Sequence, residues 1–240
     1  MKVGLITSSI EKGAVSIRNY TRNLLKGLLE VVDGNIEICQ IHNNARFLNS
    51  LLNTIALSKH NVDVLHIPHL AGASSPSAIY LLNKLRSKLV VTLHGVAPLV
   101  VPPDLYYSGR RAFISRAFTH LSVARWRLLF RKKIDRIITV SNSAKKNIIK
   151  TLRIPENKIE VIYHGVNHHL FKPYDKINEL KRSLDEKYKI GNKPFIFHVS
   201  SYQPKKNTSA LIKAFHDVSK ELSEYNLIVA GKGFEPIRKL

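Results

Sequence analysis

The 240-residue chain carries 38 lysine and arginine residues against 17 aspartate and glutamate residues, a formal net charge of +21 at pH 7. Its 44% hydrophobic and 23% charged content are ordinary for a folded protein and exclude an intrinsically disordered chain. Cys39 is the only cysteine, which excludes an intrachain disulfide and Cys-x-x-Cys zinc or redox sites. The charge points instead to partners: phosphate-bearing ligands, nucleic acid or an anionic membrane surface.

No stretch of the chain approaches the roughly 20 apolar residues that a transmembrane helix needs. The N-terminus, MKVGLITSS, has too short an apolar run for a signal peptide and is typical of a first core strand. We therefore expect a cytoplasmic protein, with peripheral attachment to the inner face of the membrane as an open alternative.

Short β-branched runs alternate with longer amphipathic stretches in the first two thirds of the chain. Strands are predicted at Val3–Thr7, Glu37–Ile41, Val62–Ile67, Lys88–Leu93, Arg136–Val140 and Lys158–Ile162. Helices are predicted near 16–32, 45–58, 74–86, 111–132 and 143–152. The alternation indicates an α/β fold, a doubly wound parallel sheet with helices on both faces.

The pattern breaks at a proline-containing connector around 171–174 and then starts again. A charged helix is predicted at about 176–188, followed by a strand at Pro194–Val199, a helix at 206–222 and a strand at Asn226–Ala230. Connectors of this kind are usual domain boundaries. We predict an N-terminal Rossmann-like domain over 1–174 and the start of a second, incomplete Rossmann-like domain over 175–240.

His94 and Gly95 stand where the predicted strand Lys88–Leu93 gives way to a loop. Ligands of open α/β sheets bind outside the carboxyl ends of the strands, so His94 is well placed to exchange a proton or hydrogen bond with a reacting group. A histidine that only satisfies a buried strand end is an equally good interpretation of the position alone.

Two further segments precede predicted helices and could approach phosphate. The loop 8–14 follows the first strand and contains Gly13 and Ala14, although a tight turn explains Gly13 equally well. Lys205 and Lys206 follow the first strand of the second domain, where two ammonium groups beside a helix N-terminus suit a diphosphate. An ordinary pair of solvated lysines is the alternative.

The segment 105–134 is strongly basic and contains no acidic residue before Asp135. A basic amphipathic helix with aromatic residues suits an anionic bilayer surface, and an ordinary sheet-covering helix with a solvated basic face is the alternative. The candidate surface residues are Arg116, Arg125, Trp126, Arg127, Arg131 and Lys132. The sequence contains no His-Glu-x-x-His motif, Walker A motif or Asp-x-Asp pair, so we expect no metal site.

Several segments in order resemble glycosyltransferase family 4, also called group 1 glycosyltransferases. The most specific block is Pro155, Lys158–Ile162, His164–Asn167 and Phe171–Pro173, which is similar to the family's Lys-Ile-x-Val-Ile, Asn-Gly-Val-Asp and Phe-x-Pro elements. The other matching segments are Lys12–Ala14 with Tyr20, Thr92–Gly95, Ile137–Ser143, Gln203–Asn207 with Leu211–Phe215, and Leu227–Gly233.

The resemblance implies a GT-B fold and retaining, metal-independent transfer of a hexose from a nucleoside-diphosphate sugar, with no other cofactor. His94 would lie beside the donor sugar, and Lys205 and Lys206 would hold the diphosphate. The resemblance also implies cleft loops at Gly13, Ala14, Gly95, Ser141, Gly165, Gly231 and Gly233. The acceptor would be a glycan or a lipid-linked sugar.

The chain also departs from the family pattern. Ala14 replaces a glycine, His164 and Asn167 replace Asn and Asp, and the family's Glu-x7-Glu segment has no counterpart before Leu240, which indicates C-terminal truncation. A catalytically incomplete fragment or a binding subunit that needs a partner chain is therefore the alternative to an active transferase. Nucleic-acid binding is the third hypothesis, disfavoured because no nucleic-acid module is recognisable.

Overall fold

The computed structural model describes residues 1–7, 10, 15–42, 60–69, 86–102, 105, 121, 123–191 and 193–234. The predicted helix 45–58 and nearly all of 74–86 lie outside these residues, as does half of 111–132. The chain divides into two compact units. The first unit consists of residues 1–101 and 117–164, and the second unit of residues 102–116 and 165–240.

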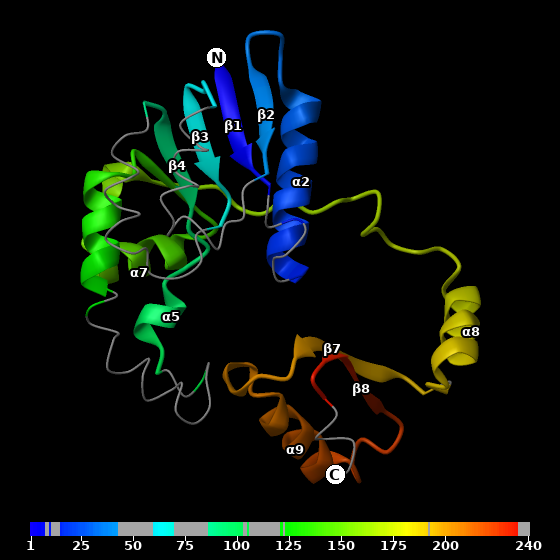
Figure 1. Ribbon diagram of the computed structural model, residues 1–240. Coiled ribbons are helices and arrows are strands. Elements are labelled where there is room, and N and C mark those ends of the chain that lie inside the picture. The colour runs from blue at the N-terminus through cyan, green and yellow to red at the C-terminus, as the bar shows by residue number, and fades with distance from the viewer. Residues whose placement is uncertain are drawn as a thin grey trace. The chain divides into compact units, whose positions relative to one another are not determined.

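The first unit is built on a six-stranded parallel sheet (Figure 1). Its strands are β1 (Lys2–Ile6), β2 (Glu37–Ile41), β3 (Val64–Ile67), β4 (Lys88–Thr92), β5 (Arg136–Thr139) and β6 (Ile159–Val161), in the spatial order β2-β1-β3-β4-β5-β6. Each coincides with a predicted strand to within two residues. The order reverses at β1, which pairs with β2 on one side and with β3 on the other. Sheets of this class bind ligands at the carboxyl ends of strands near such a reversal.

The sheet carries the hydrophobic core. Leu5, Val91 and Ile137 have no solvent exposure, and Ile67 is 1% exposed. Parallel strands are covered on both faces, which is why these runs are nearly continuous in apolar residues instead of alternating. The core positions the strand ends rigidly, and the candidate functional residues extend from those ends.

Helices connect the strands in both directions along the sheet. α2 (Val15–Val31) follows β1 and leads to β2, whereas α7 (Asn142–Leu152) follows β5 and leads to β6 through the 3-10 turn η3 (Glu156–Lys158). Because parallel crossovers are right-handed, connections that run in opposite directions place their helices on opposite faces. The short helix α5 (Ala97–Val100), which the sequence did not indicate, follows β4.

The ends of α7 follow from local chemistry. The Ser141 hydroxyl accepts a hydrogen bond from the Ala144 amide at 3.1 Å and so caps the first turn. At the other end Arg153 adopts the left-handed conformation, with φ of 52°, and its amide donates to the Ile149 carbonyl. Ile148 and Leu152 are fully buried, which fixes the helix against the sheet.

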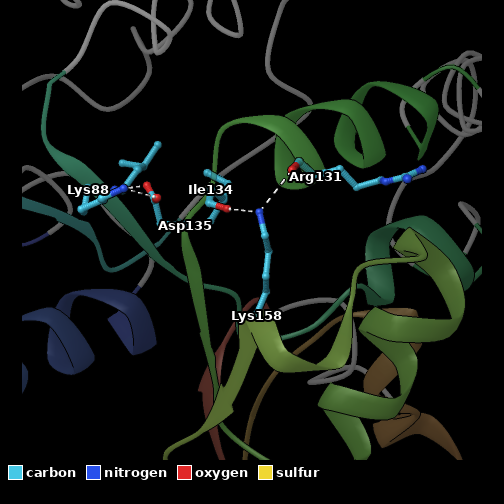
Figure 2. Close-up of polar contacts among 6 residues, drawn as sticks. Lys88, Arg131, Ile134, Asp135 and Lys158 are labelled. Atoms are coloured by element: carbon cyan, nitrogen blue, oxygen red, sulfur yellow. Dashed lines mark hydrogen bonds and ion pairs between the residues drawn. The ribbon is translucent and has the colours of Figure 1, made fainter.

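Residues 123–132 are helical, and a lysine from another element satisfies the end of this segment. The Lys158 ammonium donates to the carbonyl oxygens of Arg131 at 3.2 Å and Ile134 at 2.9 Å (Figure 2). Helix ends leave carbonyl groups without intrahelical partners, and a cation there also opposes the helix dipole. Next to it, the Asp135 carboxylate accepts the Leu89 amide at 2.8 Å and thereby joins this end of the helix to β4.

Among its described residues, the second unit contains a two-stranded parallel sheet, two α-helices and a 3-10 turn. They are α8 (Ile177–Tyr188), β7 (Phe195–Ser201), η4 (Pro204–Lys206), α9 (Thr208–Val218) and β8 (Asn226–Lys232). α9 is shorter than the predicted helix 206–222, because the turn η4 precedes it and turns follow it. Residues 162–176, which link β6 to α8, contain no helix or strand, and the two units divide within this connector, at 164/165; the boundary near 174 stays a prediction.

Apolar side chains in the second unit are much less covered than those of the first. Among the described residues from 165 onward, no hydrophobic side chain is buried, and Phe197 and Val199 are 58% and 67% exposed. Thr208, at the start of α9 and 2% exposed, is the one buried residue among those described in this stretch. It lies 3.3 Å from the His198 ring nitrogen and so connects α9 to β7.

Candidate functional site

Three histidines and a tyrosine come together in the first unit from four separate elements. Tyr20 lies on α2, His69 follows β3, His94 follows β4, and His164 follows β6. Because all six strands are parallel, the segments that follow β3, β4 and β6 leave the same edge of the sheet. We call these four residues the histidine cluster. Its location is the edge at which open α/β sheets bind ligands.

The rings of the histidine cluster are in direct contact. Tyr20 and His94 meet edge to face, with ring centroids 4.6 Å apart and an interplanar angle of 86°. His164 lies 5.1 Å from the Tyr20 ring and 5.7 Å from the His94 ring, and His69 lies 5.9 Å from His94. Aromatic pairs at these separations attract one another beyond the effect of burial. The contacts hold His94 between groups from three other elements.

His94 is held as a neutral imidazole. Partial burial lowers its pKa, and the nearby His69 and His164 lower it further, while the Pro68 carbonyl acts in the opposite direction. His94 Nε2 lies 3.2 Å from the Pro68 carbonyl oxygen. A carbonyl can only accept, so Nε2 carries the proton and Nδ1 of the neutral ring keeps its lone pair. Nδ1 can therefore accept a hydrogen bond from a ligand hydroxyl or take up a proton.

A chain of side-chain hydrogen bonds joins Tyr20 of the histidine cluster to His66 through Thr92. The Thr92 hydroxyl is 3.2 Å from the Tyr20 hydroxyl and 2.9 Å from His66 Nε2. Burial lowers the pKa of His66 to about 4, so that ring is neutral near pH 7. Burial also raises the pKa of Tyr20, against the smaller effect of its bond to Thr92, so its phenol is protonated. All three groups are uncharged in the resting site.

In the second unit, Lys205 and Lys206 lie in η4, immediately before α9, and both are exposed. Partial desolvation lowers the pKa of Lys205, and the neighbouring Lys206 lowers it further. Asn207 separates the two lysines from the helix and has the left-handed φ of 50°. The lysine pair therefore stands at the N-terminal end of an 11-residue helix, an arrangement suited to an anionic ligand.

The residues predicted to lie in cleft loops are found in different structural settings. Gly13 and Ala14 lie outside the described residues. Gly95 and Gly165 have open space where a Cβ would stand, whereas the Ser141 hydroxyl is occupied in capping α7. Gly231 lies within β8 and not in a loop after it, because the strand continues to Lys232, and Gly233 follows with φ of 80°.

Gly231 is required by the pairing of the two strands. It has φ of 146° and pairs with Ser200 on β7, and a Cβ at this position would lie 1.5 Å from the Ser200 carbonyl oxygen. No side chain fits such an approach. The strand pairing is thus a sufficient reason for this glycine.

Only some of the residues predicted to form an exposed basic surface are exposed in the structure. Trp126 is 7% exposed and lies in the core with its ring 5.5 Å from that of Phe130, so its assignment to an exposed membrane or acceptor surface is wrong. The helix turns this apolar residue toward the sheet. Arg127 is half-buried and donates to the Thr151 carbonyl at 3.0 Å, and Arg125 is also half-buried. Arg131 and Lys132 are exposed, and Arg116 lies outside the described residues.

The residues around His94, and the hydrogen-bonded residues connected to them, were not predicted as site residues. They are His69, Tyr20 and His164 in the first group and Thr92 and His66 in the second. The signal that selected His94, a histidine at the end of an apolar strand, is also present in Val64-Leu65-His66-Ile67-Pro68-His69 and could have found two of them. Tyr20 and His164 lie far apart in sequence, and only the fold brings them to His94.

Within the described ranges, no group of three or more His, Cys, Asp and Glu side chains has the arrangement to hold a metal ion. In the same part of the chain, no helix combines the length and the apolar character needed to cross a bilayer.

Comparison with known proteins gives a family match and structural neighbours. Residues 32–170 match the model of Glycosyltransferase Family 4. The structure of Anabaena Alr3699/HepE in complex with UDP and glucose is 17% identical, with a TM-score of 0.59 over 100% of this chain and 64% of that one. Its complex with UDP-glucose is 18% identical, with a TM-score of 0.56 over 95% of this chain and 60% of that one. No curated protein matches the chain by sequence.

At such low identity the structural likeness concerns the fold, which is α/β of the GT-B type. The chain spans 64% and 60% of the length of these two neighbours. The family match covers more than half of the chain, from the end of α2 through β6 and into the connector. It includes His94, His164, Ser141 and the helical segment 123–132. The chain therefore belongs to Glycosyltransferase Family 4.

Proposed function

We propose that this protein transfers a hexose from a nucleoside-diphosphate sugar to a glycan or lipid-linked acceptor, with retention of configuration and without a metal ion. The observation that carries the proposal is the placement of His94, held at the carboxyl edge of the sheet by contacts from α2 and from the segments after β3 and β6. Structural neighbours with this fold are named as complexes with UDP, glucose and UDP-glucose.

In this mechanism His94 acts on the sugar. Its Nδ1 accepts a hydrogen bond from a donor-sugar hydroxyl, and that bond strengthens as positive charge develops on the ring during departure of the diphosphate. A neutral imidazole is needed, because a charged one would repel the developing oxocarbenium ion. The low pKa of His94, caused by burial and by His69 and His164, keeps the ring neutral.

Lys205 and Lys206 stabilise the departing diphosphate. With no Asp-x-Asp pair in the sequence to hold a divalent cation on the phosphates, the ammonium groups and the amides at the start of α9 supply the positive charge. The partial desolvation of Lys205 strengthens its attraction to a phosphate oxygen. Retention of configuration rests on the family resemblance.

The experiment is a transfer assay on the native protein with a panel of nucleoside-diphosphate sugars, run both with and without EDTA. We expect His94→Ala to lower kcat by about 100-fold or more. Lys205→Gln with Lys206→Gln should weaken donor use, whereas Lys213→Gln, an exposed lysine on α9, serves as the matched control. The anomeric proton signal in the NMR spectrum of the product tests retention. Unchanged turnover in His94→Ala, or loss of turnover in EDTA, overturns the mechanism.

The exposed pair Arg131 and Lys132 favours an anionic or lipid-linked acceptor, or attachment to an anionic membrane. Sedimentation with vesicles containing phosphatidylglycerol tests this. Arg131→Glu with Lys132→Glu should abolish binding, whereas Lys146→Glu with Lys150→Glu, the same charge change on exposed positions of α7, should weaken it only slightly. Arg127 is unsuitable because it also bonds to Thr151. Equal losses in both double variants would indicate attraction by net charge alone.

The exposed Phe197 and Val199 favour a second candidate function, that of a subunit whose β7 face contacts a partner chain. Light scattering on the purified chain distinguishes the two cases. A monomer that transfers sugar without any added protein contradicts the subunit hypothesis. A chain that is inactive alone and self-associates until Phe197→Ser and Val199→Ser are introduced supports it.

A further inference from the structure

His66 is a buried polar residue in a strand that is otherwise apolar. It is 7% exposed, and its strand neighbours Leu65 and Ile67 are 2% and 1% exposed. A polar ring at such a position costs free energy unless it is hydrogen-bonded, and an aliphatic residue would fill the space without that requirement. Its bond of 2.9 Å to the Thr92 hydroxyl meets the requirement for Nε2.

Thr92 couples His66 to the histidine cluster. Its hydroxyl has one proton and lies within bonding distance of both His66 Nε2 and the Tyr20 hydroxyl. Two arrangements use the Thr92 proton within this chain: Tyr20 donates to Thr92 and Thr92 donates to His66, or His66 donates to Thr92 and Thr92 donates to Tyr20. In both arrangements, the direction of the hydrogen bond between Thr92 and His66 determines the direction of the bond between Thr92 and Tyr20. Thr92 is completely buried and β-branched, so its hydroxyl cannot turn away freely.

We propose that His66 is a positioning residue. Through the Thr92 hydroxyl it fixes the position of Tyr20, and the Tyr20 ring in turn holds the rings of His94 and His164 in place. The role at a reacting sugar rests on the proposed function. The positioning itself rests on the two hydrogen bonds and on the ring contacts of Tyr20 at 4.6 Å and 5.1 Å.

The position of His66 excludes a direct catalytic role for it. The ring contacts no group of the histidine cluster except through Thr92, among the contacts of the described residues, and it is neutral at pH 7. A neutral buried ring can orient a hydroxyl without adding a charge near His94. This distinguishes positioning from acid–base catalysis.

The test follows the His94 ring by NMR on the intact chain carrying ¹³C-labelled histidine, with the His94 signal assigned from its absence in His94→Gln. The titratable groups that face His94 are Tyr20, His69 and His164. In Thr92→Val and His66→Leu we expect the Tyr20 ring-current shift on His94 to be lost. The His94 titration midpoint should move upward by about 0.5 pH unit, because a loosened Tyr20 admits water.

His66→Gln is the matched control, because an amide can replace Nε2 in the bond to Thr92. We expect its His94 signal and midpoint to stay at the wild-type values. A His94 signal unchanged in both His66→Leu and Thr92→Val overturns the proposal, and so does an equal change in His66→Gln and His66→Leu. If His66→Leu fails to fold, Thr92→Val, which keeps the side-chain shape, decides between these outcomes.

A second measurement separates this inference from the proposed function. The NMR experiment needs no donor, so it judges the positioning even if no transfer is detected. If the protein is a transferase, His66→Leu should lower kcat about tenfold with little change in donor KM, and His66→Gln should restore it. Wild-type kinetics in His66→Leu overturn the catalytic part of the proposal.

Discussion

The two units present their charged and titratable groups in opposite ways. In the first unit, histidines stand at the edge of a closed core, and burial lowers the pKa values of His66, His69 and His94. In the second unit, the candidate ligand-binding residues are lysines on an exposed turn. No described apolar side chain from residue 165 onward is buried. The first unit holds uncharged rings in fixed positions, whereas the second unit exposes positively charged lysine side chains to solvent.

The difference shows what each candidate site requires of its fold. A neutral imidazole depends on low polarity and on neighbours held within a few ångströms, so it needs the rigid strand ends of the first unit. An ammonium group that meets a phosphate needs only to be present at the right end of a helix. We therefore expect changes in packing to affect the first unit strongly and the second unit weakly.

The largest expected effect is on the core of the first unit. Leu152→Ala removes a side chain with no solvent exposure and should lower the free energy of unfolding by about 3 kcal/mol. Leu180→Ala, on α8 and 43% exposed, should change it by less than about 0.5 kcal/mol. Chemical denaturation followed by Trp126 fluorescence reports on the first unit, and circular dichroism reports on the whole chain. Equal costs for the two variants would contradict the comparison.

A smaller effect is expected from pH. The pKa of His66 is about 4 in the folded chain against an ordinary value near 6.5, so the unfolded chain binds the extra proton between these values. Folding stability from this group is complete above pH 6.5 and is lost as the pH falls toward 4. The loss at pH 5 should be about 2 kcal/mol.

The measurement is the denaturation midpoint of wild type and His66→Gln at pH 7 and pH 5. The wild type should lose more stability than the variant over this interval. Identical losses would mean that His66 is accessible to protons in the folded chain. Other carboxylates and histidines contribute equally to both proteins and cancel in the comparison.

The smallest expected difference concerns two lysines that bond to carbonyl groups. Lys158→Met removes a part-buried bond to the Ile134 carbonyl and an exposed bond to the Arg131 carbonyl, and should cost about 1 kcal/mol. Lys193→Met in the second unit removes an exposed bond of 2.8 Å to the Ser223 carbonyl and should cost less than about 0.5 kcal/mol. Thermal unfolding of both variants at one pH makes the comparison. A larger cost for Lys193→Met would reverse the ranking of the units.

Strand positions and fold class were predictable from the sequence because buried parallel strands are continuous apolar runs. The bounds of β2 agree with the predicted strand, and the other strands of the first unit differ by two residues or fewer. The family resemblance is confirmed by the match over 32–170. The roles of His94, Lys205 and Lys206 stay predictions.

The face of a helix that meets the core, and contacts between residues far apart in the sequence, were not predictable in the same way. Trp126 was expected at a surface because arginines surround it in sequence, but a helix separates neighbours onto different faces and this face meets the core. The contact of Tyr20 with Thr92 joins residues 72 positions apart. Such a pair follows from the sheet order, which a strand pattern alone does not specify.

Gly231 has a consequence for the evolution of this chain. Its backbone lies so close to the Ser200 carbonyl that even an alanine methyl group has no room, whatever molecule the second unit binds. We expect relatives that keep the β7–β8 pairing to show an unvarying glycine here, including relatives that have lost or changed their chemistry. Invariance at this position would be a record of strand geometry, and it would be poor evidence for a shared ligand.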